Sequence, residues 1–290
     1  MSEPAPARID PEGEALVAAL QADRSWHVAC VVGPTDAGKT TLCRLLGWRL
    51  GGELATLAVD ADPGQSSLGP PACVALAREP WDGGPPLALR FVGSTSPAGH
   101  FLQALSGIKR LVERALAEGA RRVVVDSSGY MGDPAGAEYH YRVLDLLAPD
   151  HVVVLQRRDE MEPLLAALGG RARACLHRVP VSAAVRRRPL EARRAYRQRR
   201  FAGYFRSAGP LTVGLRRLGR HGMLPPSLHE ARDCLVALCD DHGFAAALGI
   251  VQAADEGREE MQLWCPPVDL TRVASVQFSR LRLDPSGRPV

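Results

Sequence analysis

The chain has 290 residues with a formal net charge of +4, and 46% of its residues are hydrophobic. This length allows one large α/β domain and a smaller one, each with a buried core. No apolar run in the sequence is long enough to span a membrane, and the acidic, proline-bearing start of the chain lacks the apolar centre of a signal peptide. We therefore expect a cytoplasmic protein with no membrane partner.

The cysteines predict neither a disulfide framework nor a metal site. There are seven of them, an odd number, and Cys234 and Cys239 are too far apart for a CxxC pair. No histidine pair completes a set of zinc ligands by its spacing. We therefore expect reduced, mostly buried thiols.

The expected elements alternate between strands and helices in chain order as far as residue 181. The apolar run at 26–32 indicates a buried strand, and 41–50 follows it as a helix. Further strands are expected at 54–59, 87–92, 121–125, 151–155 and 174–181, and helices at 99–118, 138–147 and 160–168. This alternation predicts a largely parallel sheet with helices on both faces, whose ligands bind at the carboxyl ends of the strands.

The pattern changes after Pro210 to short strands separated by glycine and proline turns. We expect strands at 211–215, 245–251, 260–264 and 276–283, and one helix near 228–239. The fold class predicted is α/β, a P-loop NTPase fold with a mostly parallel sheet flanked by helices, plus a small C-terminal β-rich domain. The expected parts are an N-terminal arm at 1–24, a P-loop domain at 25–208 and the β-rich domain at 209–290.

The segment after the first strand, Gly33 to Thr41, reads GPTDAGKTT and fits the Walker A pattern GxxxxGK[ST]. Backbone N–H groups of such a loop and the positive end of the following helix cradle phosphate oxygens. Lys39, one of only two lysines, would reach the β- and γ-phosphates, and the Thr40 hydroxyl would take a Mg²⁺ position. The alternative is a chance glycine-rich turn. The predicted ATP-binding residues are Gly33, Thr35, Asp36, Ala37, Gly38, Lys39, Thr40 and Thr41.

Two carboxylates follow the next expected strand in the run Asp60-Ala61-Asp62-Pro63-Gly64-Gln65. Asp60 could hold Mg²⁺ directly or through water, and Asp62 could accept a proton from an attacking hydroxyl. Gln65 could hydrogen-bond a phosphate or the nucleophile. The alternative is a polar strand-to-helix turn in which aspartate and glycine take turn positions.

Two further loops are open to two interpretations. The run DSSGYMG, from Asp126, offers hydroxyl and backbone donors at Ser128 and Gly129, and the ring of Tyr130 could stack on a base or pack on the core. The run GSTSPAGH, from Gly93, is either a phosphate-facing helix start or a serine-capped one.

The stretch from residue 186 to 206 carries nine arginines and a single acid, Glu191. Such a run is often only a solvated helix face, but downstream of a P-loop it is typical of a lid whose arginines neutralise charge on a transferred phosphoryl group. The NKxD motif of GTPases and the LSGGQ motif of ABC ATPases are both absent from the sequence. A kinase that transfers the γ-phosphate fits this combination best.

Together these segments resemble the polynucleotide 5′-hydroxyl kinase family, over about residues 25 to 283. The matching runs are GPTDAGKTT, DADPGQSSLGPPACVAL, SPAGH, DSSGY, RRAYRQRRFAGYF and LGIVQAADEGREEMQLWCPP. The resemblance implies transfer of the γ-phosphate of ATP to the 5′-hydroxyl of RNA or DNA, with ATP and Mg²⁺ required. It gives no protein partner.

The resemblance also implies a role for individual residues. Lys39 would stabilise the transferring phosphoryl group, and Asp62 would be the general base. Thr40 and Asp60 would organise Mg²⁺. Gln65 is predicted to contact the substrate, and the clasp that grips the substrate would be Ser128-Gly129-Tyr130.

Arg193 and Arg197 would be the lid arginines, although Arg194 and Arg199 are one register slip away. The family's clasp usually ends in Gly-Trp, whereas this chain has Gly129-Tyr130, so less aromatic area is available for stacking. Two other functions remain open: a non-catalytic ATP-binding scaffold of an RNA-processing complex, and a nucleoside or small-molecule kinase.

Overall fold

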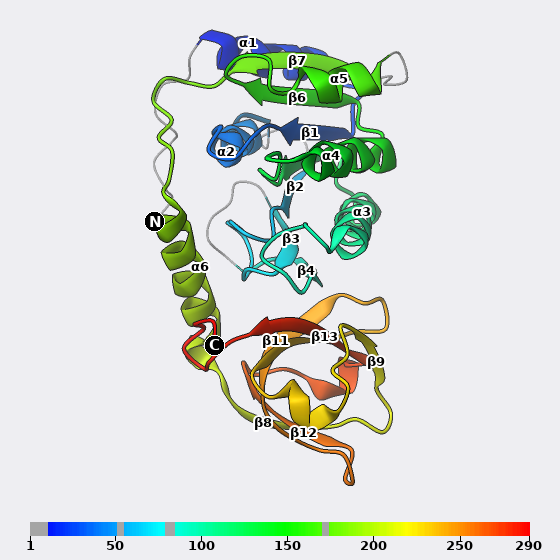
Figure 1. The fold of residues 1–290 in the computed structure, drawn as a ribbon. Helices are drawn as coiled ribbons and strands as arrows, with labels where there is room; N and C mark the ends of the chain where they lie inside the picture. Colours follow the sequence, from blue (N-terminus) through cyan, green and yellow to red (C-terminus); the bar gives the residue numbers. More distant parts are fainter. Residues whose placement is uncertain (1–10, 51–54, 79–84, 170–173) are drawn as a thin grey trace.

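The computed structural model describes residues 11–50, 55–78, 85–169 and 174–290. Two sheets form the framework, and helix α6 (Leu190–Tyr204) runs along one side between them (Figure 1). None of the helices in the described ranges is both long and apolar enough to cross a membrane.

Sheet A has seven strands in the order β4-β3-β2-β5-β1-β6-β7. Strands β2, β5, β1, β6 and β7 run parallel, whereas β3 and β4 pair antiparallel at one edge. The strands are β1 (Val28–Val32), β2 (Thr56–Ala61), β3 (Cys73–Arg78), β4 (Ala88–Phe91), β5 (Arg122–Ser127), β6 (His151–Gln156) and β7 (Cys175–Pro180). The mostly parallel sheet is confirmed. Residue 54, where one strand was expected to begin, lies outside the described residues.

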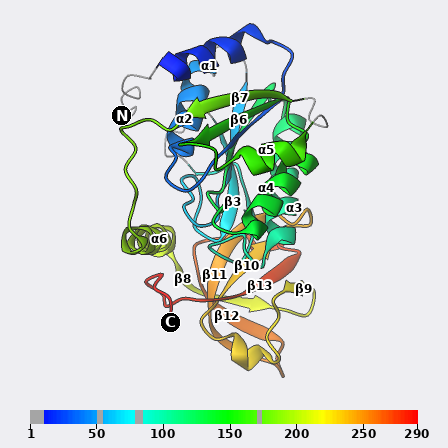
Figure 2. The ribbon, with the colours of Figure 1, turned by 45° about the horizontal axis from the view of Figure 1, so that its top comes forward.

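Helices cover both faces of sheet A, as Figures 1 and 2 show. One face packs against α1 (Pro11–Ala22) and α2 (Lys39–Leu50), and the other packs against α3 (Phe101–Ala117), α4 (Pro134–Leu147) and α5 (Glu162–Leu168). The central strands are buried on both faces because they lie between these two layers, and their sequences are accordingly continuous apolar runs such as Val28–Val32.

Sheet B has six strands in the order β8-β12-β11-β10-β13-β9. Its pairs are antiparallel except β13 with β9. The strands are β8 (Gly209–Gly214), β9 (Gly219–Gly222), β10 (Cys234–Cys239), β11 (Ala245–Asp255), β12 (Glu260–Cys265) and β13 (Ser275–Arg282). The bounds 25–208 and 209–290 given to the two domains stay a prediction.

The helix expected near 228–239 is wrong. A short 3₁₀ turn, Leu228–Ala231, comes first, Asp233 takes a positive φ of 65°, and β10 then follows. The run Cys-Leu-Val-Ala-Leu-Cys is buried at every position in the middle of sheet B, so its apolar character reflects a strand covered on both faces.

A shared hydrophobic cluster joins the two sheets. It contains Cys73 and Phe91 of sheet A, Leu235 of sheet B, and two phenylalanines, Phe201 and Phe205, at the end of α6. Both phenylalanine side chains are only 3% exposed. The carboxyl end of the arginine-rich helix is therefore part of the core between the domains.

Candidate active site

The P-loop connects β1 to α2, which begins at Lys39. Gly38 has a φ of +90°, a conformation that a side chain would strain. The Lys39 side chain is only 7% exposed, and its ammonium group donates hydrogen bonds to the carbonyl oxygens of Gly33 at 2.9 Å and Pro34 at 3.0 Å. Burial lowers the pKa of Lys39, and the charges of Asp126 and Asp62 oppose that shift. The P-loop thus holds the Lys39 ammonium group away from water, against its own backbone carbonyl oxygens.

Two buried carboxylates lie side by side at the carboxyl end of sheet A. Asp60 of β2 is in register with Asp126 of β5, and their side chains are 1% and 2% exposed. The Thr40 hydroxyl donates to Oδ2 of Asp126 at 2.6 Å. Oδ1 of Asp126 is buried and has no hydrogen-bond partner among the described residues. Burial and the charge of Asp60 raise the pKa of Asp126 to about 7.

Asp60 has different partners. Its Oδ2 accepts hydrogen bonds from the backbone N–H groups of Ser67 at 2.6 Å and Leu68 at 3.2 Å, and its Oδ1 accepts one from Asp62 at 3.1 Å. The hydroxyls of Ser66 and Ser67 also donate to Oδ2. Burial and the neighbouring charge of Asp62 raise the pKa of Asp60. In this structure Asp60 therefore anchors the loop that follows its own strand.

Asp62 begins that loop and is half-buried. Its Oδ1 accepts backbone hydrogen bonds from Gly64 at 2.8 Å and Gln65 at 3.0 Å, while its Oδ2 lies 3.4 Å from the nitrogen of Gly129. The loop after β2 therefore holds one oxygen of the Asp62 carboxylate, and the other oxygen points toward the DSSGY loop. The Gln65 side chain donates to the Gly64 carbonyl at 3.0 Å.

The DSSGY loop packs directly on the P-loop. The Thr35 hydroxyl donates to the Gly129 carbonyl at 2.8 Å, and a Cβ added at Gly129 would lie 2.6 Å from the Thr35 hydroxyl oxygen. Only glycine allows this approach. Tyr130 donates to Asp133 at 2.8 Å, and its half-buried ring packs at the edge of the core beside Phe101.

Helix α6 lies against the loops of the site. The Tyr196 hydroxyl donates to the Ser66 carbonyl at 2.9 Å, and Arg200 donates to the Gly69 carbonyl at 2.6 Å. Arg193 pairs with Asp36 of the P-loop at 2.7 Å, and Arg188, which precedes the helix, pairs with the same carboxylate at 3.1 Å. The Asp36 side chain is only 2% exposed. Burial alone would raise the pKa of Asp36, but hydrogen bonds and charge from the two arginines lower it overall.

The arginines of α6 fall on two faces. Arg193, Arg197 and Arg200 are half-buried, whereas Arg194 and Arg199 are exposed. Burial and the charge of Arg194 lower the pKa of Arg197, and the charge of Asp62 opposes this shift. Arg193 pairs with Asp36 of the P-loop and Arg197 lies within reach of the charge of Asp62, so the role of these two residues as lid arginines stays a prediction with this support.

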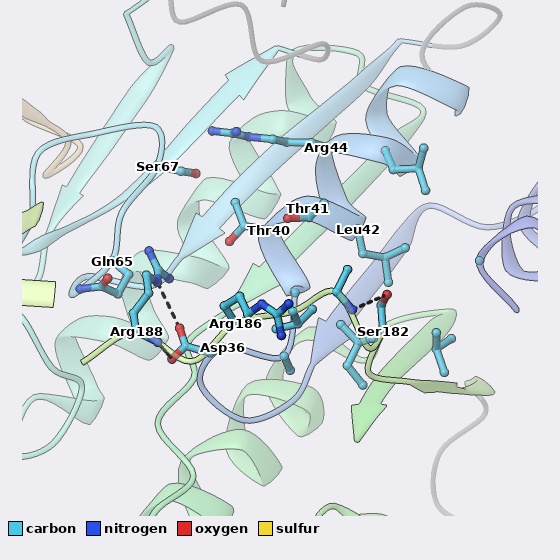
Figure 3. Close-up of a pocket in the computed structure, with 18 of the residues that line it drawn as sticks. Asp36, Thr40, Thr41, Leu42, Arg44, Gln65, Ser67, Ser182, Arg186 and Arg188 are labelled. Carbon is cyan, nitrogen blue, oxygen red and sulfur yellow. Dashed lines mark hydrogen bonds and ion pairs between the residues drawn. The ribbon is translucent and has the colours of Figure 1, made fainter. Parts of the chain in front are cut away.

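A cavity of about 680 Å³ extends from the P-loop along α2 (Figure 3). Its lining includes side chains of the P-loop, of α2, of the loop after β2 and of the segment before α6: Asp36, Ala37, Gly38, Thr40, Thr41, Leu42, Arg44, Gln65, Ser67, Ser182, Arg186 and Arg188. Figure 3 shows Gln65, Arg186 and Arg188 around the Thr40 end of this space. The cavity joins an anion-binding loop to several arginines, so it suits a phosphorylated ligand.

The structure brings together the predicted site residues of three loops and of helix α6, and it adds residues without a predicted role. Asp126 is part of a motif quoted from the sequence, and its place at the end of an expected strand is the sequence signal for a further acid at this edge of the sheet. Arg188 and Tyr196 gave no such signal, because their partners are distant in sequence. Among these groups, Thr40 and Asp126 supply oxygen donors of the kind that Mg²⁺ prefers, including the buried Oδ1 without a partner in the described chain.

The chain is similar to known proteins over most of its length. Residues 33–207 match the family described as mRNA cleavage and polyadenylation factor CLP1 P-loop. The polyribonucleotide 5′-hydroxyl-kinase of Thermococcus kodakarensis is 27% identical across 89% of this chain and 88% of its own length. The corresponding enzyme of Methanocaldococcus jannaschii is 23% identical across 89% and 87%.

A solved structure of wild-type Clp1p in complex with Pcf11p is similar in fold, with a TM-score of 0.68 at 16% identity, covering 93% of this chain and 78% of that one. The family match covers more than half of the chain. It includes the P-loop, the acids Asp60, Asp62 and Asp126, and the arginine-bearing helix α6. The chain belongs to the CLP1 P-loop family.

Proposed function

We propose that the chain is an ATP-dependent polynucleotide 5′-hydroxyl kinase, which transfers the γ-phosphate of ATP to the 5′-hydroxyl end of RNA, DNA or both. The observation that carries this proposal is the set of contacts among the P-loop, Asp62 and α6. Arg193 of α6 pairs with Asp36 of the P-loop, and the charge of Asp62, whose Oδ2 lies 3.4 Å from the nitrogen of Gly129, acts on Arg197 of the same helix. The names of the relatives described above, polyribonucleotide 5′-hydroxyl-kinases, support the same activity.

In the reaction, the 5′-hydroxyl oxygen attacks the γ-phosphorus, and the bond from that phosphorus to the β–γ bridging oxygen breaks, so that ADP leaves. Asp62 takes the proton of the hydroxyl, because its Oδ2 is directed toward the DSSGY loop where the acceptor strand would lie. Ser128, Gly129 and Tyr130 would hold that strand, and Gln65 would bind a phosphate or the attacking hydroxyl. Positioning of this kind supplies most of the catalysis in phosphoryl transfer.

The cations of the site have a separate role. Phosphate oxygens would replace the carbonyl oxygens of Gly33 and Pro34 as acceptors for the Lys39 ammonium. Arg193 would exchange Asp36 for the transferring phosphoryl group, and Arg197 would approach it from the same helix face. Asp36 thus keeps a lid arginine beside the P-loop until a phosphate competes for it. The remaining P-loop residues, Thr35, Ala37, Gly38, Thr40 and Thr41, would complete the ATP cradle.

Mg²⁺ fits the donor set of Thr40 and Asp126, and when bound it would neutralise charge on the β- and γ-phosphates. We assign Asp126 as the carboxylate ligand in place of Asp60. The oxygens of Asp60 are already occupied by five donors of its own loop, so Asp60 would act on the metal only indirectly.

The test is transfer of labelled γ-phosphate from ATP to matched 5′-hydroxyl RNA and DNA oligonucleotides. Transfer that the Lys39→Ala variant loses would establish the kinase and rank its two substrates. Intact ATP binding without transfer to either oligonucleotide would contradict the proposal and favour the scaffold function. Mononucleosides that compete efficiently would instead favour a small-molecule kinase.

The arginines near the site would hold backbone phosphates of the acceptor oligonucleotide without reading its sequence. Oligonucleotide binding should therefore weaken as salt rises, because each neutralised phosphate releases counterions. A flat response between low and moderate salt would count against these contacts.

A further inference from the structure

A cluster of histidine and cysteine side chains lies at the opposite end of sheet A from the P-loop. The ligand atoms of His151, Cys175 and His177 all lie within 4.8 Å of one another. The parallel register of β6 and β7 produces this arrangement, because His151 is the partner of Cys175, and Val153 is the partner of His177. Side chains two residues apart on a strand point to the same face, so all three side chains share one face of the sheet.

The two imidazoles already face each other. Nδ1 of His151 lies 3.0 Å from Nε2 of His177. The other nitrogen of His151, Nε2, lies 3.2 Å from a carboxylate oxygen of Asp23, which follows α1. The contact does not have the geometry of a hydrogen bond, and the Asp23 side chain is 40% exposed. Asp23 is fixed in turn by the N–H and hydroxyl of Ser25, at 2.8 Å and 2.6 Å.

A carboxylate beside Nε2 favours the tautomer in which Nε2 carries the proton, and Nδ1 then presents its lone pair to His177. Carboxylate, histidine and metal follow one another in this order in many metal sites, where the carboxylate orients the ring and strengthens it as a ligand.

The thiol differs from the other cysteines of the chain. Cys175 is exposed on β7, the edge strand of sheet A, whereas the other six cysteines are buried. A cation can therefore reach Cys175 from solvent, while His151, 3% exposed, supplies a rigid ligand beneath it. Two imidazole rings can hydrogen-bond each other without a thiol nearby. The Cys175 sulfur on the same face of the sheet distinguishes this cluster from an ordinary histidine pair.

We propose that His151, Cys175 and His177 bind Zn²⁺ through Nδ1, Sγ and Nε2. Thiolate and imidazole are the ligands that suit this ion, and three of them leave a fourth position for water. On binding, the Cys175 thiol releases its proton to solvent, and no electron is transferred. The uncharged His177 ring carries its one proton on Nδ1, which leaves Nε2 free to bind the ion. The ion would join the edge strand β7 to β6 beside the end of α1 (Figure 1). Nothing in this proposal depends on the kinase activity.

The test uses the full chain, purified without a polyhistidine tag and stripped with a chelator, and Co²⁺ as the probe. We expect about one Co²⁺ per chain with a thiolate-to-cobalt charge-transfer band that Zn²⁺ removes by competition. Cys175→Ser should abolish the band, and Asp23→Asn should weaken binding by roughly 10- to 100-fold. His177→Gln should weaken binding by at least about tenfold, whereas the matched control His242→Gln, an exposed histidine outside the cluster, should have no effect.

A second readout does not depend on the spectrum. Zn²⁺ should raise the midpoint of thermal unfolding of the wild-type chain, because an ion that binds only the folded state stabilises it, and this rise should be lost in Cys175→Ser. The absence of a charge-transfer band at micromolar Co²⁺, or a band that survives in Cys175→Ser, would overturn the proposal.

Discussion

The polar side chains at the two ends of sheet A are held in place in different ways. At the carboxyl end, Lys39, Asp60 and Asp126 are almost fully buried and of both charges, and their partners come from loops and from α6. At the amino end, His151 and His177 lie on paired strands whose register fixes them. Buried charge is costly unless it is compensated. The two proposals above accordingly assign a charged, transient ligand to the carboxyl end and a fixed ion to the amino end. Substitutions at one end should leave the function of the other unchanged.

The largest effect is expected from Lys39→Ala. Loss of the ammonium should lower phosphoryl transfer by roughly 10³-fold or more, since it removes a cation placed for the charge of the transition state. The control is Lys109→Ala, the only other lysine, which lies on α3 and pairs with Glu113 at 3.9 Å. Single-turnover transfer measures both variants, and equal rates for the two would refute the assignment of the P-loop lysine.

A smaller loss should follow from Arg197→Ala. We expect turnover to fall by about 10²-fold with ATP affinity little changed, because the lid arginine acts on the transition state. Arg199→Ala on the exposed face of the same helix should stay within about twofold of wild type, as is usual for surface changes. Steady-state kinetics with ATP titration separates the two variants. A fall in ATP affinity alone would make Arg197 a binding residue.

Asp126→Asn sharpens the assignment of the metal ligand. It should raise the Mg²⁺ concentration needed for half-maximal transfer by about 10-fold or more, since it replaces a carboxylate ligand by an amide. Asp60→Asn should mainly lower the midpoint of thermal unfolding, because Asp60 accepts the N–H groups of its own loop. Mg²⁺ titrations of transfer and thermal melts compare the variants, and the opposite assignment of effects would restore Asp60 as the ligand.

Gly129→Ala tests the close approach of the DSSGY loop to the P-loop. The added Cβ would meet Thr35, so we expect a loss of about tenfold in turnover and about 1–3 kcal/mol of stability. Gly132→Ala, in the same loop, is the matched control, since nothing lies within 4 Å of a Cβ at that position. Transfer assays and denaturant unfolding would show the difference. Identical behaviour of the two variants would remove the packing argument.

The smallest effect on transfer is expected from Cys175→Ser. Its rate should stay within about twofold of wild type, because Cys175 lies at the amino end of β7 and outside the P-loop cavity. The transfer assay with the metal-free and the Zn²⁺-loaded chain checks this. A large loss of transfer would show that the two ends of the sheet are coupled.

Much of the carboxyl end could be predicted from the sequence because its chemistry lies in short contiguous motifs. GPTDAGKTT directly follows β1, and DADPGQ begins at the end of β2, so the local sequence is sufficient to predict both loops. The partner of Thr40 could not be predicted in the same way. Asp60 and Asp126 both end strands, and only the order of strands in sheet A and the side-chain contacts distinguish them.

The features that were harder to predict are strands and side chains whose neighbours in a sheet cannot be seen in the local sequence pattern. The cysteine spacing predicts no zinc set, and the zinc site proposed above rests on the register of β6 and β7, which brings Cys175 and His177 to His151. The run at Cys234–Cys239 was taken for a helix because a short apolar run does not show which kind of layer covers it. Strand β3 was missed in the same way, since it pairs antiparallel with β2 and β4 within a mostly parallel sheet.

The cluster around Phe201 and Phe205 has a consequence for how this protein can evolve and be engineered. Its side chains come from sheet A, from the end of α6 and from sheet B, so the arginine-bearing helix is rooted in a core that both domains complete. The C-terminal tail adds to this root, because Gly287 lies against the backbone of Phe201 and Ala202. Modularity is therefore limited. A chimera in which the β-rich domain is exchanged must keep the hydrophobic cluster around Phe201 and Phe205. Otherwise the carboxyl end of α6 is no longer anchored, and its arginines are no longer held near the P-loop.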